Sequence, residues 1–407
     1  MSEFINNVTR RKEAIKNILR QLHAGKSVDE VKSEFAALLK EVDATEIAEV
    51  EQQLIEEGLP AAEIQRLCDV HVAVFRESLA EHKSPDTIPG HPLHSLLTEN
   101  HAATQVLERL REALQDLKKY PNAITSRLAR QQLEKLRGFD KHYLRKENLL
   151  FPYLEKVGFS GPSVVMWGIH NDIRADWKAL DALLEAGLSD DSEKVIAKVE
   201  EIFNRFDKAM REMFYKEENI LFQAALDRLT DADWLAIREQ EDAIGFFYVH
   251  PEDWQPQPAP AAVSALPDSS SSAAASGVEQ LLALTTGALK LEQVNLMLST
   301  LPVDLTFVDE NDEVRFFSQN KDRVFERSPA IIGRKVQNCH PPQSMDRVQR
   351  ILDDFRAGQR DEAAFWLRLQ GKFIYICYYA LRDENGAYRG TLEVTQDITK
   401  LHQLEGE

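Results

Sequence analysis

Apolar residues recur at helical spacing through most of the first 250 positions of the chain, and charged residues occupy the outer faces of the predicted helices. Within residues 6–82 this pattern is interrupted at Gly25, Gly58 and Pro60, which are residue types that commonly end helices. The sequence therefore predicts a first group of helices in this segment.

A second helical block follows a loop of turn-forming residues at 84–90 and extends over residues 91–244. Turn-forming residues at 120–122 and 158–162 separate the predicted helices, and the block yields four long ones. Four long helices joined by short connections are typical of a four-helix bundle.

The pattern changes after residue 250. Residues 251–277 are rich in proline, alanine and serine, which indicates a flexible linker. Residues 278–301 have the leucine spacing of an amphipathic helix. Short runs of β-branched and aromatic residues then predict strands at 305–309, 314–317, 364–369, 373–381 and 389–394. This last part is predicted to be an α+β domain with an antiparallel sheet.

A chain of 407 residues is too long for one ordinary hydrophobic core, so we expect a multidomain protein. The predicted boundaries are a helical domain at 1–83, a four-helix bundle at 84–250, a linker at 251–277 and an α+β domain at 278–407.

Charge and cysteine content restrict the function. The formal net charge of -18 disfavours nucleic acid or an anionic membrane as a direct partner, because both repel an acidic protein. Cys68, Cys339 and Cys377 are too few and too scattered for a disulfide framework. The first residues contain no apolar run, and no segment is apolar enough to span a bilayer. We therefore expect a cytoplasmic protein.

A short repeat is the main indication of chemistry. The segment KENLLF at residues 146–151 returns as EENILF at residues 217–222. Each copy follows a segment that contains a histidine, LHSL at 93–96 and IHND at 169–172. Carboxylates and imidazoles that project inward from opposed helices can hold a pair of metal ions in a four-helix bundle.

This block resembles the hemerythrin-like HHE cation-binding bundles. The resemblance implies non-heme iron, held as a pair of ions or as a single ion, with an open coordination position for dioxygen or a related small ligand. The best candidate ligands are His94, His142, Glu147, His170 and Glu218, and the close alternatives are His91 and Glu217.

The resemblance is incomplete. Tyr143 and Phe214 stand where the family has a histidine four residues before the glutamate. His142 precedes Glu147 by five residues, which is about 140° around an α-helix. A complete five-histidine site is therefore absent, and a carboxylate-rich di-iron site, a mononuclear site and a lapsed site with ordinary buried polar contacts all fit the sequence.

Two lysines and a further histidine near the repeat can also be interpreted. Lys146 and Lys216 each precede an acidic residue of the repeat, where they could neutralise buried carboxylates or, more commonly, extend to the surface. His101 lies about 10 Å along the helix from His94 and is expected in another layer.

The N-terminal segment resembles the family called domain of unknown function 438, which precedes a hemerythrin-type bundle and a PAS domain. The residues that carry the resemblance are IQRLCDVH at 64–71 and PGHPLH at 89–94. Cys68 and His71 could be functional, but buried packing is the favoured interpretation because free cysteines are usually buried.

The C-terminal segment resembles a PAS domain, on LPVDLTFVD at 301–309, IGRKV at 332–336 and EVTQDIT at 393–399. The resemblance implies a sensory fold that encloses a small ligand and forms a homodimer through the preceding helix. His340 precedes two prolines that fix the backbone, so it could be an axial ligand of heme iron, with Cys339 as a weaker candidate. A capping histidine, with another ligand or none, is the favoured alternative.

Together these features predict a cytoplasmic sensor or regulator in which bundle iron responds to dioxygen, nitric oxide or redox state. The sequence contains no recognisable kinase, cyclase or DNA-binding motif. The protein would therefore pass its signal on through self-association or through a separate protein. The alternatives are an iron or heme enzyme that acts on peroxide or a small substrate, and a structural adaptor without metal.

Overall fold

The computed structural model divides the chain into two compact units. The first holds Met1–Gln255 with the short segment His340–Ser344, and the second holds Pro256–Cys339 and Met345–Glu407. The residues that the structure describes are 2–27, 29–31, 44–60, 63–64, 88–187, 192–254, 281–284, 286–320, 323–340, 342–369 and 371–403.

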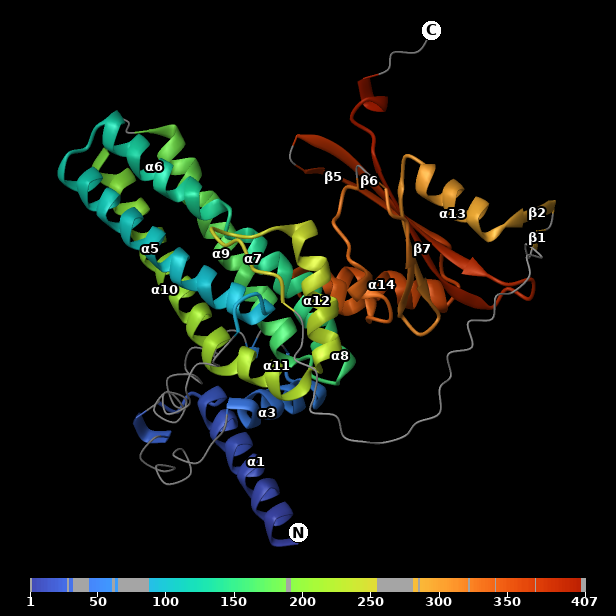
Figure 1. Ribbon diagram of the computed structural model, residues 1–407, viewed down its shortest axis with the longest axis horizontal. Coiled ribbons are helices and arrows are strands. Elements are labelled where there is room, and N and C mark those ends of the chain that lie inside the picture. Colours follow the sequence, from blue (N-terminus) through green and yellow to red (C-terminus); the bar gives the residue numbers. More distant parts are fainter. Residues whose placement is uncertain are drawn as a thin grey trace. The chain divides into compact units, whose positions relative to one another are not determined.

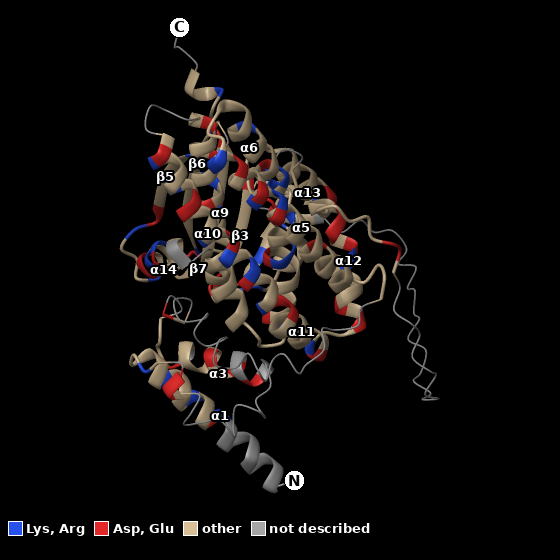
Figure 2. Cartoon of the chain, turned by 90° about the vertical axis from the view of Figure 1, so that its left-hand side faces the viewer, with Lys and Arg blue, Asp and Glu red and all other residues tan. Residues whose placement is uncertain are grey.

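Three of the sequence predictions therefore lie outside the described residues, at Cys68, at His71 and over most of the linker at 251–277. In the described ranges, no helix has the length and apolar character needed to cross a bilayer. Acidic and basic residues are interspersed along the described helices and strands (Figure 2).

Four long helices form the bundle of the first unit (Figure 1): α5 (Pro92–Lys119), α6 (Ala123–Arg137), α9 (Gly161–Ala186) and α10 (Ser192–Lys216). Shorter helices continue the chain around them: α7 (Asp140–Arg145), α8 (Phe151–Lys156), α11 (Phe222–Arg228) and α12 (Asp231–Ile244). The predicted helical region with a four-helix bundle is confirmed.

Local sequence explains where α6 begins. Asn122 accepts hydrogen bonds from the backbone N–H groups of Ile124 (2.9 Å) and Thr125 (3.1 Å). The Thr125 hydroxyl in turn accepts one from the Asn122 N–H, which completes a capping box. The break predicted at 120–122 is this cap.

The two copies of the repeat adopt the same unusual backbone. Each forms one π-helical turn, η1 (Lys146–Leu150) and η2 (Glu217–Leu221), between two α-helical segments. Single π turns inside α-helices are rare in general, and many of those that occur lie at functional sites. The internal repeat is therefore present in the backbone as well as in the sequence.

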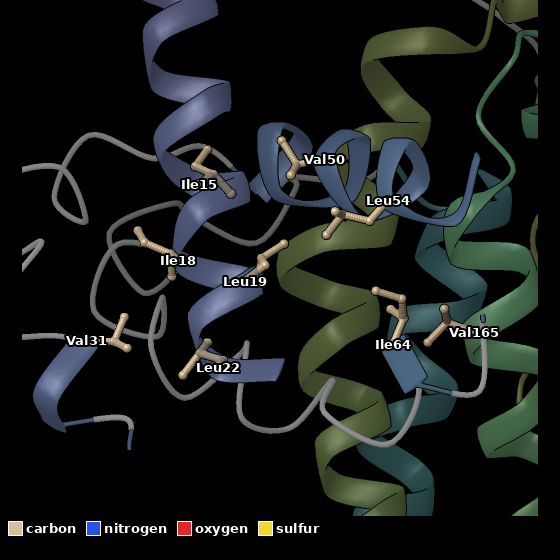
Figure 3. Packing of buried hydrophobic residues seen from close by; sticks show 9 residues of the cluster. All are labelled: Ile15, Ile18, Leu19, Leu22, Val31, Val50, Leu54, Ile64 and Val165. Atoms are coloured by element: carbon tan, nitrogen blue, oxygen red, sulfur yellow. The ribbon is translucent and has the colours of Figure 1, made fainter. Parts of the chain in front are cut away.

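The N-terminal helices α1 (Ser2–His23) and α3 (Ala44–Glu56) dock on the bundle. Ion pairs join Glu49 of α3 to Lys12 (2.6 Å) and to Arg228 of α11 (2.5 Å). The apolar contact (Figure 3) contains Ile15, Ile18, Leu19, Leu22, Val31, Val50, Leu54, Ile64 and Val165. Ile64 and Val165 lie side by side in that view, so the contact reaches α9 of the bundle.

The second unit contains a five-stranded antiparallel sheet with the strand order β4-β3-β7-β6-β5. The strands are β3 (Asp304–Asp309), β4 (Val314–Phe317), β5 (Glu362–Leu369), β6 (Lys372–Arg382) and β7 (Tyr388–Asp397). The connecting helices are η3 (Pro329–Ile331), η4 (Val336–Cys339) and α14 (Pro342–Arg356). The predicted α+β architecture is confirmed.

One predicted element of this unit is wrong. Instead of a continuous helix over 278–301, the structure has a hairpin of β1 (Leu281–Leu284) and β2 (Gly287–Lys290) before α13 (Leu291–Thr300). Gly287 follows two threonines and has φ 156°, a backbone conformation that side chains disfavour. The β-branched pair disfavours a helix and the glycine favours a turn, so the helix pattern is interrupted at this point.

Candidate functional site

The centre of the bundle holds a buried ammonium group. Lys146 begins η1 and is 0% exposed. Its Nζ donates a hydrogen bond to His170 Nε2 at 3.0 Å and another to Glu217 Oε1. Lys146 and Glu217 are the first residues of the two copies of the repeat. Equivalent positions in the two halves therefore carry opposite charges and form an ion pair with each other.

His170 is fixed as a neutral ring by its partners. Because Lys146 donates to Nε2, the proton of the neutral ring is on Nδ1, which donates to Glu147 Oε1 at 2.7 Å. Burial lowers the pKa of His170 well below its usual value, and the charges of Lys146 and Arg174 lower it further. Arg174, one turn along α9, donates to both carboxylate oxygens of Glu147 at 2.8 and 3.0 Å.

His142 lies between two carboxylates. Its Nδ1 is 2.9 Å from Glu99 Oε2, and its Nε2 is 3.2 Å from Glu217 Oε2. Each of these carboxylates can accept a hydrogen bond from the ring nitrogen that faces it. The Asn100 amide also donates to Glu217 (2.9 Å) and to Glu218 (3.2 Å), which brings the second copy of the repeat into the same network.

Glu99 of α5 is a further centre of hydrogen bonding that is 0% exposed. It accepts from His142, from Arg145 at close range and from the backbone N–H of Phe247 at 2.7 Å. Arg145 also donates to Glu241 at 3.0 Å. A carboxylate with three buried donors is strongly held in place.

Four buried carboxylates of this network are bonded to basic side chains. The buried carboxylates of Glu99, Glu147, Glu217 and Glu241 are bonded to Arg145, Lys146, Arg174 and His142. Although burial opposes it, the charges of Lys146 and His142 lower the pKa of Glu217 to about 2. Burial raises the pKa of Glu241 to about 7 against the opposing charge of Arg145.

Aromatic rings cover both histidines. Tyr143 stacks on His170 with ring centroids 4.2 Å apart, and Phe139 stacks on His142 at 4.5 Å. The Tyr143 hydroxyl is buried and has no hydrogen-bond partner among the described residues, and burial raises its pKa well above the usual value. Tyr143, which stands at a position where a histidine was expected from the family pattern, thus packs on an imidazole instead of adding one.

The structure brings together five of the seven predicted bundle residues: His142, Glu147, His170, Glu217 and Glu218. His94 lies half-buried on α5 and makes none of the hydrogen bonds described above. His91 is the N-cap of α5, where its Nδ1 accepts from the Leu93 N–H at 3.1 Å. Its ring packs between those of Trp234 and Trp254, each with a centroid distance of 4.8 Å.

The role of His91 as a cap predicts an acid-sensitive contact. Burial lowers the pKa of His91 to about 4, below its unfolded value of 6.5. Its contribution is therefore fully present above pH 6.5 and is lost as the pH falls through 4. The full shift is worth about 3 kcal/mol, which solvent screening reduces to about 2 kcal/mol.

Lowering the pH from 7 to 4 should decrease the free energy of unfolding of both the natural chain and His91→Asn, a variant that preserves a capping side chain. We expect this decrease to be about 2 kcal/mol smaller in the variant. Urea denaturation of both proteins at the two pH values measures this difference. An identical loss in both proteins would show that another group carries the acid sensitivity.

Sequence reasoning missed Glu99, Asn100, Arg145, Arg174 and Glu241. Two of them had a visible signal. Glu99 lies three residues after Leu96 and four before Ala103, on the apolar stripe of its helix, where an acid needs a partner. Arg174 lies four residues after His170 and therefore on the same helix face.

The predicted heme ligands lie at the end of η4 and directly after it, Cys339 as its last residue and His340 as the next one. Cys339 packs against the apolar cluster around Val308, and its Sγ is 3.7 Å from the Lys335 carbonyl oxygen. His340 is half-buried at the bend that follows η4. Heme ligation by His340 stays a prediction.

The face of the sheet that packs on α14 is partly polar. Val308 contacts α14, and Asp304 and Thr306 share its face because alternate residues of a strand do. Thr306 pairs with Glu393, whose other cross-strand neighbour is Tyr378, and all three are buried. Buried hydroxyl and carboxyl groups suit a polar ligand better than the apolar face of a heme.

Comparisons with known families give three matches in the predicted order. Residues 15–81 match a family of unknown function (DUF438), residues 91–225 match the hemerythrin HHE cation binding domain, and residues 294–399 match a PAS domain. All three predicted resemblances are confirmed. No curated protein matches the chain.

Solved structures also resemble parts of the chain. The C-terminal domain of a Streptococcus mutans protein is 36% identical over 31% of this chain and 98% of that one, with a TM-score of 0.30. A Colwellia psychrerythraea PAS domain is 16% identical over 27% of this chain and 98% of that one, with a TM-score of 0.21. A sensory box sensor histidine kinase from Vibrio cholerae is 15% identical over 26% of this chain and 90% of that one, also with a TM-score of 0.21.

The HHE match implies a bound cation, but the donors at the bundle centre do not fit one as they stand. An imidazole needs a lone pair to bind a metal. The Nε2 lone pair of His170 accepts from Lys146, and both nitrogens of His142 face carboxylates. Within the described ranges, no group of three histidine, cysteine, aspartate or glutamate side chains has the arrangement of a metal site.

Proposed function

We propose that this chain is a sensory or regulatory protein in which the hemerythrin-type bundle and the PAS domain receive signals, rather than an enzyme. The observation that most supports this proposal is the burial of the chemically active groups. His142, Lys146 and His170 are each 0% exposed. An organic substrate needs an open cleft, whereas a proton or a diatomic molecule can reach buried groups through small fluctuations of the surrounding helices.

Contacts around the network offer a route for a signal. Ile169 adjoins His170, and Ile220 lies three residues after Glu217. Both pack against the apolar cluster formed by α1 and α3. A rearrangement of the network would therefore shift side chains on which the N-terminal helices rest, and this contact supports a regulatory coupling between the two.

The proposed output is self-association with a second copy of the chain. Helix α13, which precedes the PAS sheet, exposes Leu291 (61%), Leu296 (57%) and Met297 (58%). Exposed apolar side chains that recur on one short helix are typical of an association surface. Sedimentation of the full chain measures this association.

The sensory proposal is tested by exposing the purified full chain to dioxygen, nitric oxide and hydrogen peroxide in turn. We expect at least one of them to change the sedimentation coefficient or the hydrogen-exchange rates of α1 and α3 reversibly, without multiple-turnover consumption of the reagent. Catalytic consumption of peroxide or oxygen by the chain would contradict the proposal and favour an enzyme.

Iron at the bundle centre is the second candidate, favoured by the HHE match and by the gathering of two imidazoles and three glutamates in one layer. Elemental analysis and an absorption spectrum of protein purified without chelator test it. About two irons per chain with oxo-bridge bands would establish a di-iron site. A Soret band that is lost in His340→Ala would instead place heme in the PAS domain.

A further inference from the structure

We propose that the ammonium group of Lys146 takes the place of a metal ion at the centre of this bundle. In this proposal the chain folds without a metal, and a divalent metal binds at the centre only after Lys146 has been removed. The proposal does not depend on the sensory role.

The position of the Lys146 ammonium supports the first part. It lies within hydrogen-bond distance of His170 Nε2 and of Glu217 Oε1, an imidazole and a carboxylate from two different helices. Imidazole and carboxylate are the ligand types that zinc, iron and cobalt accept together. Lys146 therefore occupies the point at which these two groups converge, and it satisfies both of them as a cation would.

The repeat explains how this arrangement arises in the fold. Glu147 and Glu218 occupy equivalent positions of the two copies, but the residues before them, Lys146 and Glu217, differ in charge. Two acids at those equivalent positions would face each other and need an added cation between them. A lysine at one of them supplies that cation from the chain itself.

The charges of the network also support the proposal. The four buried carboxylates of the network are each bonded to an arginine or a lysine: Glu99 and Glu241 share Arg145, Glu217 is bonded to Lys146, and Glu147 is bonded to the half-buried Arg174. A divalent ion at the point where His170 and Glu217 converge would lie beside the Lys146 ammonium. Because like charges in close contact repel each other, the intact network disfavours the ion at that point.

Removal of Lys146 changes both the hydrogen bonding and the charge at this point. In Lys146→Ala the Nε2 lone pair of His170 is released, and Glu217 is left without its lysine partner. The space vacated by the side chain lies between these two ligands, with Glu218 close to Glu217 through their shared contact with Asn100. A metal ion at that point restores the lost charge and binds at least two protein ligands.

The test measures binding of Zn²⁺ and Co²⁺ to the full-length natural chain, to Lys146→Ala and to the matched control Lys198→Ala, which removes an exposed lysine from α10. Equilibrium dialysis gives the stoichiometry, and the visible bands of Co²⁺ report imidazole and carboxylate ligation. We expect the natural chain and Lys198→Ala to bind no stoichiometric metal at the centre. We expect Lys146→Ala to bind one ion per chain at least about tenfold more tightly than either.

A second variant keeps the test decisive if removal of the lysine disturbs folding. Lys146→Ala with Glu217→Gln removes one of the two ligands and should lose the gained binding, while far-ultraviolet circular dichroism shows whether each variant remains helical. The proposal would be overturned if the natural chain contained stoichiometric metal and if removing that metal with a chelator lowered the Tm. It would also be overturned if folded Lys146→Ala bound no more metal than the natural chain.

Discussion

Replacing Lys146 with methionine is expected to lower the free energy of unfolding of the first unit by about 3 to 5 kcal/mol. Methionine preserves most of the side-chain length, so the effect comes from charge and hydrogen bonding rather than from a cavity. The substitution leaves the Glu217 carboxylate buried without its lysine partner, and it removes the donor to His170 Nε2.

Tryptophan fluorescence during urea denaturation measures this effect selectively. Of the five tryptophans, Trp167, Trp177, Trp234 and Trp254 lie in the first unit, and only Trp366 lies in the second. Working in a Trp366→Phe background therefore makes the signal specific to the bundle. Trp366 is 66% exposed, so its replacement should be nearly neutral.

Two comparisons control the Lys146 prediction. Lys198 pairs with Glu201 on the surface of α10, so Lys198→Met should cost less than about 0.5 kcal/mol. Adding Glu217→Gln to Lys146→Met removes the unpaired charge and should recover at least about half of the loss. A cost below about 1 kcal/mol for Lys146→Met would contradict a central role for this ion pair.

The second large effect is expected at Glu99. Glu99→Gln retains the shape of the side chain but removes the charge that His142, Arg145 and the Phe247 N–H share. The loss of a buried charged acceptor is expected to cost about 3 kcal/mol. For a unit of this size that corresponds to a decrease in Tm of about 6 to 12 °C, measurable by calorimetry.

Glu108→Gln is the matched control for Glu99 because it makes the same change on the same helix. Glu108 pairs with Arg211 at 2.6 Å, but both side chains are partly exposed to solvent. We expect the control to change the Tm by no more than about 1 to 2 °C. Equal shifts in the two variants would mean that the buried network adds no stability beyond an ordinary surface pair.

The sequence was sufficient for the fold class because the signals were local. Helical periodicity and turn residues depend on nearby positions, and each copy of the repeat, at 146–151 and 217–222, is a short continuous segment. Together these signals predicted the bundle and the α+β domain. The hairpin β1–β2 was missed because its leucines fit a helical stripe as well as a strand. Only the glycine at 287 and the preceding threonines distinguished a hairpin from a helix in this segment.

The content of the bundle centre depends on contacts between distant segments. The sequence offered His142, His170, Glu147 and Glu217 as candidate ligands, and the structure places all four in one buried network. A lysine in a polar stretch of helix, however, usually extends to solvent. Lys146 is buried because Glu217, 71 positions away, supplies the opposite charge.

Glu99 shows the same dependence on long-range contacts, since its partners lie 43 to 148 positions along the chain. The burial of an ionisable group is decided by its tertiary partners rather than by its neighbours in sequence. The structure therefore brings together five of the seven candidate ligands, whereas among the cations bonded to them the sequence indicated only Lys146, as the less common alternative.

A crystal structure of the natural chain, purified without chelator and measured at the iron and zinc absorption edges, tests the central claim most directly. We expect no anomalous peak at the bundle centre, with the Lys146 ammonium within about 3 Å of both His170 Nε2 and the Glu217 carboxylate. An anomalous peak coordinated by His170 and Glu217, with Lys146 directed elsewhere, would contradict it.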